Sequence, residues 1–537
     1  MRGFLGITGH FILDWAMKSV MICCKRFKGR HTAESIRSEY EEVVTSFEIG
    51  FKIAAIVSDN ASNMVKAFSI PGFDDFKIRN GGARYEVGAR SFTHAFDALA
   101  KLHSFTFHGN GTVSMSARFL RTTYFNESIA ANTIAPYAQF GPLNPRFDMI
   151  EKMEAIANQI DNLNVNIYRI RNAKGGNFEY MTVNDVWEVY QVSDCSLKTL
   201  KLISPPTSLK THLYLPILSS AHPVQEFGRQ TYLTFLMSVP ELPFLKSFVT
   251  LYRMSSIGDR EKIVTWYLEA PTYMHSFSVT KNYAVFIGQP VSINLWKMFS
   301  KGNIVEAMEY RYNDPTYIYV VHLRSKKITT LKYDKFVSYF HHINAYEHRK
   351  HKIVVDICTQ NSSNMHTMEM PYIRSPTLRN KVPLYYGIKR FIIDLKTPYV
   401  DARSFKPSKI VPYSNNLDMP AINENYRHVK YCFAYGLVVK ADHVNYDKWA
   451  LVKKDVCEHG GDLSWIIDNH YPSEPWFVPT LNGKKEDDGI LMTHVFDGIR
   501  KESYLVLINA VTMKTISKAN LPTNVPFSTH GRFFPDE

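Results

Sequence analysis

The chain has 537 residues, of which 45% are hydrophobic and 13% aromatic. That composition is typical of a folded globular protein and excludes a mainly disordered chain. The formal net charge of +13 allows attraction to an anionic membrane or to nucleic acid, but the charge alone does not choose between them. The most apolar early stretch, residues 11–24, is interrupted by Asp14 and Lys18, so a membrane span of roughly 20 apolar residues is not predicted. No small-residue cleavage sequence follows the stretch, so a signal peptide is not predicted either.

The six cysteines lie at positions 23, 24, 195, 358, 432 and 457. Their spacing contains no CxxC pair and no pattern typical of a disulfide framework. We therefore expect free thiols and a reducing, cytosolic compartment.

Residues 1–70 differ from the rest of the chain in their predicted secondary structure. Residues 32–48 have helical spacing, and residues 52–68 read as strand, polar turn and helix, which predicts a short α/β unit. The stretches "GITGHFI", "CCKRFKGRHTAESI" and "VSDNASNMVKAF" resemble part of the RNase H-like catalytic core of hAT-type transposases. The resemblance places Asp59 in a metal-binding acidic cluster, but the other acidic residues of that cluster are missing. We therefore expect residues 1–74 to be a non-functional fragment and nucleic acid not to be a partner.

From about residue 76 the sequence consists of many short alternating runs, such as "TYIYVVHL", "HKIVVDICTQ" and "ESYLVLINAVT". Gly, Pro, Asn and Asp clusters separate these runs. Evenly spaced strands of this kind predict an all-β sandwich, barrel or propeller.

Four histidines occur in similar contexts at the edges of predicted strands: His222, His275, His341 and His530. Their separations of 53, 66 and 189 residues exclude a local zinc-finger or HExxH motif. If the β-rich part forms seven blades of about 65 residues, the separations correspond to one, one and three blades. Histidines at equivalent inner positions of different blades would meet on one axis and could hold a metal.

The part from residue 77 onward resembles the carotenoid cleavage oxygenases, a family that includes the β-carotene oxygenases and the retinoid isomerase of the animal eye. The matching motifs are "RNGGARYEVG", "HAFDALAKLHSF", "AHP", "YMHSFSVT", "FHHINAYE", "YPSEPWFV", "EDDGILM" and the final "THG". The resemblance implies a seven-bladed β-propeller over residues 77–537, with a helical and loop cap on one face. It also implies one Fe(II) held by His222, His275, His341 and His530. Its F-H-x-x-N pattern selects His341 over the adjacent His342.

A ligating histidine usually gives its second N–H to a carboxylate, which fixes the ring and strengthens the ligand. The family uses three glutamates for this, and the resemblance places them at Glu474, Asp418 and Asp185. Two of the three are shortened to Asp in this chain.

The chain also departs from the family in its first blade. The family's usual N-terminal segment is absent, "NGGA" stands in place of a Gly-Pro-Gly sequence, and Ala98 replaces a glycine. We therefore expect the propeller to close poorly, with exposed strand edges. Where the animal enzymes carry a cysteine-bearing loop, residues 139–145 read "QFGPLNP" and contain no thiol.

The function implied by the resemblance is that of a non-haem Fe(II) dioxygenase, which cleaves a double bond of a carotenoid or apocarotenoid into aldehyde or ketone products. Its partners would be the carotenoid or retinoid and dioxygen, in the cytoplasm, with peripheral membrane contact as an additional option. Two alternatives remain open: a retinoid isomerohydrolase of the same fold, and a degenerate, non-catalytic carotenoid-binding protein. A DNA-transacting protein is disfavoured, because the transposase-like fragment lacks the rest of its acidic cluster.

Overall fold

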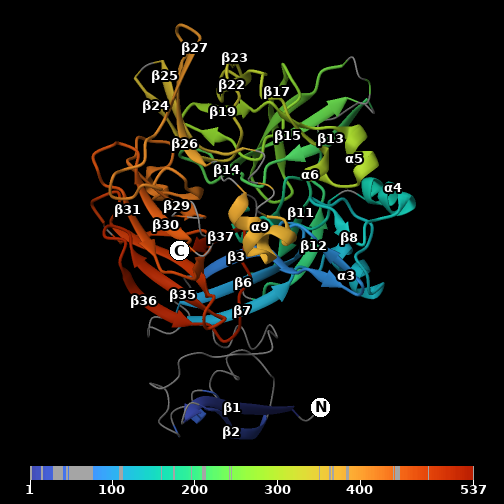
Figure 1. Cartoon of the computed structure of the whole chain (residues 1–537), viewed down its shortest axis with the longest axis vertical. Coiled ribbons are helices and arrows are strands. Elements are labelled where there is room, and N and C mark those ends of the chain that lie inside the picture. The colour runs from blue at the N-terminus through green and yellow to red at the C-terminus, as the bar shows by residue number, and fades with distance from the viewer. Residues whose placement is uncertain are drawn as a thin grey trace.

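The computed structural model describes residues 3–13, 16–27, 40, 42, 43 and 46, and then residues 76–535. Within the second part it omits residues 108–112, 159, 173–175, 195, 208–212, 241, 243–244, 350, 362–364, 366–367, 383–385, 440, 442–447 and 482. In the described part of the chain, seven antiparallel sheets of four or five strands are arranged around a common centre (Figure 1). The predicted all-β, seven-bladed propeller is therefore confirmed.

We number the seven sheets as blades in chain order. Blade 1 contains β9 (Asn166–Arg171), β10 (Phe178–Val183), β11 (Val189–Val192) and β12 (Thr199–Ile203). Blade 2 contains β13 (Tyr214–Ser219), β14 (Val224–Gln225), β15 (Tyr232–Pro240), β16 (Phe248–Met254) and β17 (Arg260–Tyr267). Blade 3 contains β18 (Ser278–Val279), β19 (Tyr283–Gly288), β22 (Thr316–His322) and β23 (Ile328–Tyr333).

Blade 4 contains β24 (Tyr339–His348), β25 (Lys352–Thr359), β26 (Gly387–Asp394) and β27 (Tyr399–Ser404). Blade 5 contains β28 (Asp418–Ala421), β29 (Phe433–Val438), β30 (Ala450–Asp455) and β31 (Leu463–Ile466). Blade 6 contains β32 (His470–Pro472), β33 (Trp476–Pro479), β34 (Gly489–Asp497), β35 (Glu502–Asn509) and β36 (Thr515–Asn520). Blade 7 contains β37 (His530–Phe534), β3 (Phe76–Arg84), β6 (Leu99–Phe107) and β7 (Val113–Phe119).

Hydrophobic patterning explains the position of each strand in its blade. The middle strand β25 reads KIVVDICT, and its six central residues are buried because neighbouring blades cover both of its faces. The outer strand β36 reads TISKAN and is almost entirely exposed. Continuous apolar runs thus form the middle of a blade, and polar runs form its rim.

Blade 7 closes the ring by pairing the last described strand, β37, with β3, so that His530 lies opposite Asn80. The expectation of poor closure is wrong, because β3, β6 and β7 complete a four-stranded sheet with β37. The two glycines of "NGGA" allow this close packing. A Cβ atom on Gly81 would lie 2.6 Å from Cα of Ser528, and one on Gly82 would lie 2.6 Å from Cβ of Ala98.

Segments that connect the strands carry the helices and two small sheets. The helices are α3 (Thr123–Ala130), α4 (Met149–Ala157), α5 (Leu295–Lys301), α6 (Ile304–Ala307), α8 (Met370–Arg374), α9 (Pro376–Lys381) and the 3-10 helix η2 (Glu424–Tyr426). The small sheets are β4 (Glu86–Val87) with β5 (Arg90–Phe92) and β8 (Leu143–Asn144), and β20 (Val291–Ile293) with β21 (Met308–Tyr310). Among the described residues, none of these helices has the length and apolar character that crossing a membrane requires.

One cysteine prediction needs correction. Cys432 and Cys457 form a disulfide with a Cα–Cα distance of 5.0 Å, so they are not free thiols. The cause is strand pairing: β29 and β30 are antiparallel, with Phe433 opposite Asp455, which brings the flanking cysteines together. Cys358 is buried and free.

The N-terminal part is described only in pieces. β1 (Gly3–Leu13) and β2 (Ala16–Phe27) pair with each other as an antiparallel hairpin. Of the predicted helix over 32–48, the four described residues are helical. The predicted strand, turn and helix over 52–68, including Asp59, lie outside the described residues. The division into a fragment over 1–74 and a propeller over 77–537 stays a prediction.

Candidate metal centre

The four histidines selected from the sequence meet at the centre of the propeller. Their nearest ring nitrogens all lie within 4.8 Å of one another. Nε2 of His222 is 2.9 Å from Nε2 of His275, and Nε2 of His341 is 3.3 Å from Nε2 of His530. Four side chains far apart in the sequence therefore direct the same ring atom to one point.

Blade geometry accounts for this convergence. His341 and His530 lie on β24 and β37, the edge strands of blades 4 and 7. His222 lies between β13 and β14 of blade 2, and His275 lies just before β18 of blade 3. The histidines thus come from successive blades and then from the blade three further on, as their spacing predicts.

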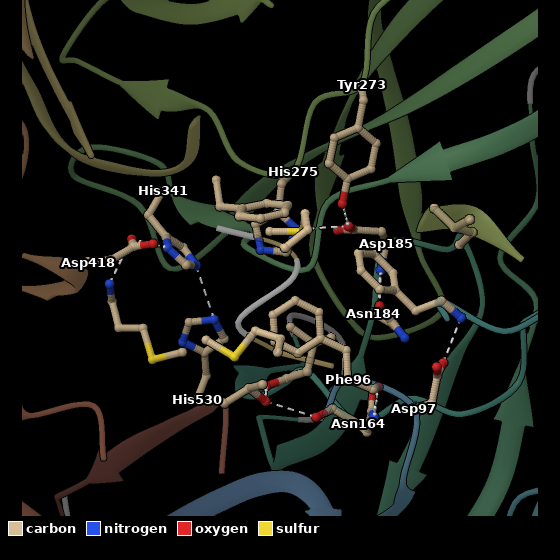
Figure 2. Close-up of a pocket in the computed structure, with 18 of the residues that line it drawn as sticks. Phe96, Asp97, Asn164, Asn184, Asp185, Tyr273, His275, His341, Asp418 and His530 are labelled. Carbon is tan, nitrogen blue, oxygen red and sulfur yellow. Dashed lines mark hydrogen bonds and ion pairs between the residues drawn. The ribbon is translucent and has the colours of Figure 1, made fainter. Parts of the chain in front are cut away.

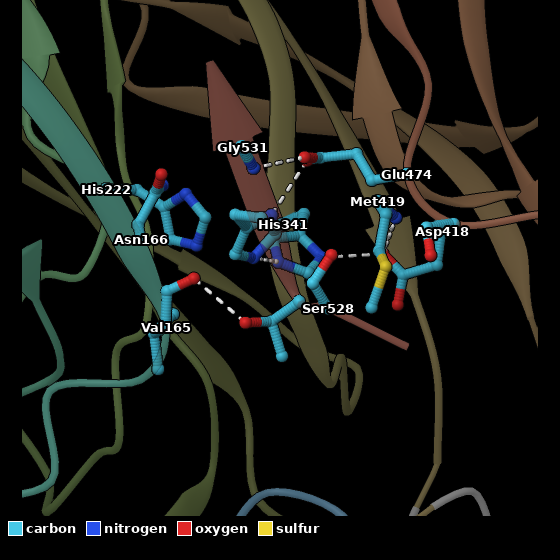
Figure 3. Close-up of polar contacts among 12 residues, drawn as sticks. Val165, Asn166, His222, His341, Asp418, Met419, Glu474, Ser528 and Gly531 are labelled. Carbon is cyan, nitrogen blue, oxygen red and sulfur yellow. Dashed lines mark hydrogen bonds and ion pairs between the residues drawn. The ribbon is translucent and has the colours of Figure 1, made fainter. Parts of the chain in front are cut away.

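Three of the histidines are each oriented by one carboxylate. Nδ1 of His275 is 2.7 Å from Asp185, Nδ1 of His341 is 2.7 Å from Asp418, and Nδ1 of His530 is 2.7 Å from Glu474 (Figure 2, Figure 3). The structure therefore brings all three predicted carboxylates to the predicted histidines. The two shortened residues reach their imidazoles at the same distance as the glutamate.

Backbone and side-chain donors fix the carboxylates in turn. Asp185 accepts hydrogen bonds from the Tyr273 hydroxyl at 2.5 Å and from the Ala221 amide at 3.2 Å. Asp418 accepts one from the Met419 amide at 2.8 Å. Motif comparison did not reveal Tyr273, but its position two residues before His275 in "YMH" places it beside the same ring.

Burial and charge set the protonation of the histidines. Burial, together with the charges of the other three rings, lowers the pKa of His222 well below its ordinary value. Burial also lowers the pKa of His530, despite the Glu474 carboxylate beside it. For His341, burial acts in the same direction, but the charge and hydrogen bond of Asp418 outweigh it and raise the pKa.

The tautomers indicate what the cluster can bind. A carboxylate can only accept a hydrogen bond, so its partner nitrogen must carry a hydrogen. When the rings are neutral, that hydrogen is on Nδ1 of His275, His341 and His530. Each Nε2 then directs a lone pair toward the others, an arrangement that is repulsive without a cation between them. The donor set therefore fits a metal ion, and imidazole nitrogen suits iron, copper, nickel and zinc alike.

Arg79 connects Glu474 to the segment that carries His530. Its fully buried guanidinium donates to the main-chain oxygen of Glu474 at 2.9 Å, and to the side chain and main chain of Ser528 at 2.5 and 3.2 Å. Burial alone would raise the pKa of Glu474, but His530, Arg79 and the Gly531 amide together hold it below its usual value. The carboxylate is therefore kept ionised beside His530.

An apolar pocket of about 160 Å³ opens on one side of the cluster. His275, His341 and His530 form part of its wall (Figure 2). Much of the remaining wall is aliphatic and aromatic and includes Phe96, Phe140, Ile293, Phe340, Leu437 and Trp449. Such a lining suits a long hydrocarbon rather than a charged ligand.

Asp97 anchors one wall of this pocket. Its two carboxylate oxygens accept the amides of Phe140 and Gly141 at 2.6 and 2.7 Å. Burial raises the pKa of Asp97 to about 7, although these two hydrogen bonds oppose the shift. The thiol-free "QFGPLNP" stretch thus begins in the wall of the pocket.

Comparison with known proteins agrees with this geometry. The family model described as retinal pigment epithelial membrane protein matches residues 77–535. The chain belongs to this family. The match covers the propeller described above and leaves out the N-terminal fragment.

Curated relatives carry related names. The beta,beta-carotene 15,15'-dioxygenase of Gallus gallus is 27% identical over 508 residues, covering 85% of this chain and 92% of that protein. The mitochondrial carotenoid-cleaving dioxygenase of Homo sapiens is 24% identical, covering 85% of each chain. The carotenoid isomerooxygenase of Galleria mellonella is 26% identical, covering 85% of this chain and 90% of that protein.

Solved structures confirm the fold. A mutant of the Synechocystis apocarotenoid oxygenase superimposes with a TM-score of 0.72 at 22% identity, covering 87% of this chain and 94% of that one. The cobalt-substituted form of the same enzyme superimposes with a TM-score of 0.72 at 22% identity, covering 86% of this chain and 93% of that one.

Proposed function

We propose that this protein is a non-haem Fe(II) dioxygenase that cleaves a double bond of a carotenoid or apocarotenoid into carbonyl products. The observation that carries the proposal is the convergence of four imidazoles, three of which line an apolar pocket. The family and the names of the curated relatives support the same reaction class. The substrates would be the polyene and dioxygen.

The proposed site residues have distinct roles. His222, His275, His341 and His530 would hold the iron, and Asp185, Asp418 and Glu474 would fix three of the rings. Ferrous iron held by four neutral ligands would supply the activation of dioxygen.

The protein's own contribution is binding and positioning. The aromatic and aliphatic wall binds the polyene and excludes water, so that one double bond is held next to the histidine cluster. Asp97 keeps the Phe140 segment of that wall in place. The Tyr273 hydroxyl and the backbone amides keep the carboxylates oriented toward the rings.

The decisive experiment measures iron content, oxygen uptake and aldehyde release from β-carotene for the full chain. We expect one iron per chain and aldehyde release, both lost in His341→Ala. The matched control is His348→Ala, because His348 is exposed on the same strand, β24. Iron without oxygen uptake, together with turnover of a retinyl ester, would instead identify the isomerohydrolase. A folded protein that binds carotenoid without iron would identify the degenerate binder.

We also propose that the protein docks on a membrane surface from the cytoplasm. Helices α4 and α5 carry seven exposed apolar side chains, which we call the α4–α5 patch: Met149, Ile150, Met153, Ile156, Leu295, Trp296 and Phe299. Trp296 is 80% exposed and Ile150 is 69% exposed. The chain that forms α5 runs directly between Ile293 and Ile304, which line the apolar pocket. A lipid surface at this patch would place an apolar substrate near the pocket.

The composition of the patch fits a lipid surface. Lys152, Lys297 and Lys301 lie on the same two helices as the patch, together with Glu151 and Glu154 of α4. Basic side chains beside apolar ones are what peripheral membrane-binding helices use. These helices cannot be recognised as insertion elements from the sequence, because short, isolated apolar runs give no membrane signal.

Vesicle flotation tests the docking proposal. We expect the full chain to bind vesicles that contain phosphatidylserine and Trp296→Glu to lose most of that binding. The control is Leu481→Glu, since Leu481 is 89% exposed outside the patch. Equal loss of vesicle binding in both variants would refute docking through α4 and α5. Fractionation of expressing cells is a separate experiment that tests the cytoplasmic location.

A further inference from the structure

A second cavity, of about 110 Å³, lies against the same histidine cluster. His341 and His530 line both cavities, whereas His222 lines only this one. Its wall also contains Tyr168 and Arg532, from β9 and β37. We call this space the axial chamber. Its polar wall contrasts with the hydrocarbon wall of the pocket.

Three buried polar atoms in the wall of the axial chamber make no hydrogen bond of normal geometry among the described residues, although the Tyr168 hydroxyl lies near the Arg532 guanidinium. They are the hydroxyl of Tyr168, Nε of Arg532 and Nε2 of His342. Tyr168 is completely buried. Buried polar atoms are nearly always satisfied in folded proteins, so three orphans around one cavity indicate a missing partner inside it.

All three atoms can donate. The guanidinium and the phenol are donors at neutral pH. The other ring nitrogen of His342 is 2.7 Å from the Ser278 hydroxyl. If Nδ1 of the neutral ring accepts the hydrogen bond of that hydroxyl, Nε2 carries the ring hydrogen, and this is the atom that lacks a partner among the described residues. The missing partner must therefore accept hydrogen bonds.

The charge of Arg532 is also unmatched. Its guanidinium lies over the ring of Tyr168, 3.8 Å from the centroid, and 5.5 Å from that of Trp476. No carboxylate of the described residues forms an ion pair with it. The nearby acid Glu424 is held bidentately by Arg427 at 2.5 and 2.7 Å.

Glu474 is engaged as well. Its two oxygens accept Nδ1 of His530 at 2.7 Å and the amide of Gly531 at 3.0 Å (Figure 3). A buried guanidinium that faces a cavity without a carboxylate partner is normally neutralised by an anion or heavily solvated.

We infer that the axial chamber binds one small monovalent anion, a halide or a planar oxyanion such as nitrate or bicarbonate. Arg532 and Tyr168 form its principal contacts, and His342 supplies a third donor. The size of the chamber admits an anion of a few heavy atoms with some water. This site goes beyond the proposed oxygenase function and does not depend on which metal the histidines hold.

Bromide is the probe, titrated calorimetrically into the iron-loaded full chain, with ionic strength held constant by gluconate, which is too large for the chamber. We expect one site per chain, and at least a tenfold loss of affinity in Arg532→Met. Tyr168→Phe should weaken binding by a few fold, because the ring that supports Arg532 remains. The matched control, Arg324→Met, removes an exposed arginine and should bind bromide like the parent chain.

The outcomes separate this inference from the proposed function. Binding that persists in Arg532→Met but disappears when the metal is removed would place bromide on the metal and overturn the inference. Binding unaffected by metal removal and lost with Arg532 supports it, even if the protein shows no oxygenase activity. Should Arg532→Met fail to fold, anomalous scattering from a bromide-soaked crystal of the parent chain decides the question. A peak between Arg532 and Tyr168 supports the site, and water alone there refutes it.

Discussion

Asp418 offers the sharpest test of how the carboxylates support the histidine cluster. Its carboxylate lies 2.7 Å from Nδ1 of His341, and the two side chains are only 19% and 9% exposed, so solvent screens their interaction weakly. The same oxygen also accepts the Met419 amide at 2.8 Å. Replacing Asp418 therefore changes the charge beside His341, its hydrogen bond, or both.

Two substitutions separate these contributions. Asp418→Asn keeps an oxygen that can accept from both groups and removes only the charge, whereas Asp418→Ala removes the charge and the acceptor. Changes to such supporting residues reduce metal affinity about 10- to 100-fold, equivalent to about 1.4 to 2.7 kcal/mol. We expect Asn at the lower end of that range and Ala at the upper end.

Anaerobic competition of the protein with a coloured Fe(II) chelator measures the affinity. Asp334→Asn serves as the control, because Asp334 is 79% exposed and its loss should leave the affinity unchanged. The reasoning is refuted if Asp418→Ala binds iron as tightly as the parent chain while His341→Ala does not bind it. Equal losses for Asn and Ala would show that the charge alone, rather than the hydrogen bond, supports His341.

Three further predictions concern the rest of the propeller. Burial raises the pKa of Asp97 from 3.8 to about 7, so the folded state holds a proton that the unfolded state lacks. The free energy of unfolding should therefore fall as the pH rises between these two pKa values. The Asp97→Asn variant, measured by denaturation over the same pH range, should lack this decrease. Met368→Trp, in the pocket wall, should abolish carotenoid turnover while iron content stays normal; unchanged turnover would contradict the assigned pocket. Reduction of Cys432–Cys457, which are 25 residues apart, should lower the free energy of unfolding by about 3.5 kcal/mol, and an unchanged melting curve in dithiothreitol would refute that contribution.

The sequence predicts the histidine cluster well because propeller geometry converts spacing into position. His222, His275 and His341 follow one another at intervals close to one blade, and His530 follows three blades later. Repeat folds place equivalent positions on one axis, so residues that are distant in sequence become neighbours without any local motif. The carboxylates required comparison with a family, since a lone Asp in a loop carries no signal of its own.

The features that sequence reasoning missed depend on contacts between strands. Cys432 and Cys457 become neighbours only through the register of β29 and β30, and the composition around them gives no indication of it. The expected gap in blade 7 was an error of the same kind. Glycine at positions 81 and 82 admits Ser528 and Ala98 at close range, which no periodicity reveals. The axial chamber was equally invisible, because its donors come from separate blades.

The pairing of β37 with β3 has a consequence for how the protein is made. During translation, six blades can emerge from the ribosome and begin to fold while blade 7 holds only three of its strands. The strand that completes the ring also carries His530, so ring closure and completion of the four-histidine cluster are the same late event. A premature stop that removes β37 therefore leaves an open sheet edge together with a three-histidine cluster, and cellular quality control would meet both defects in one molecule.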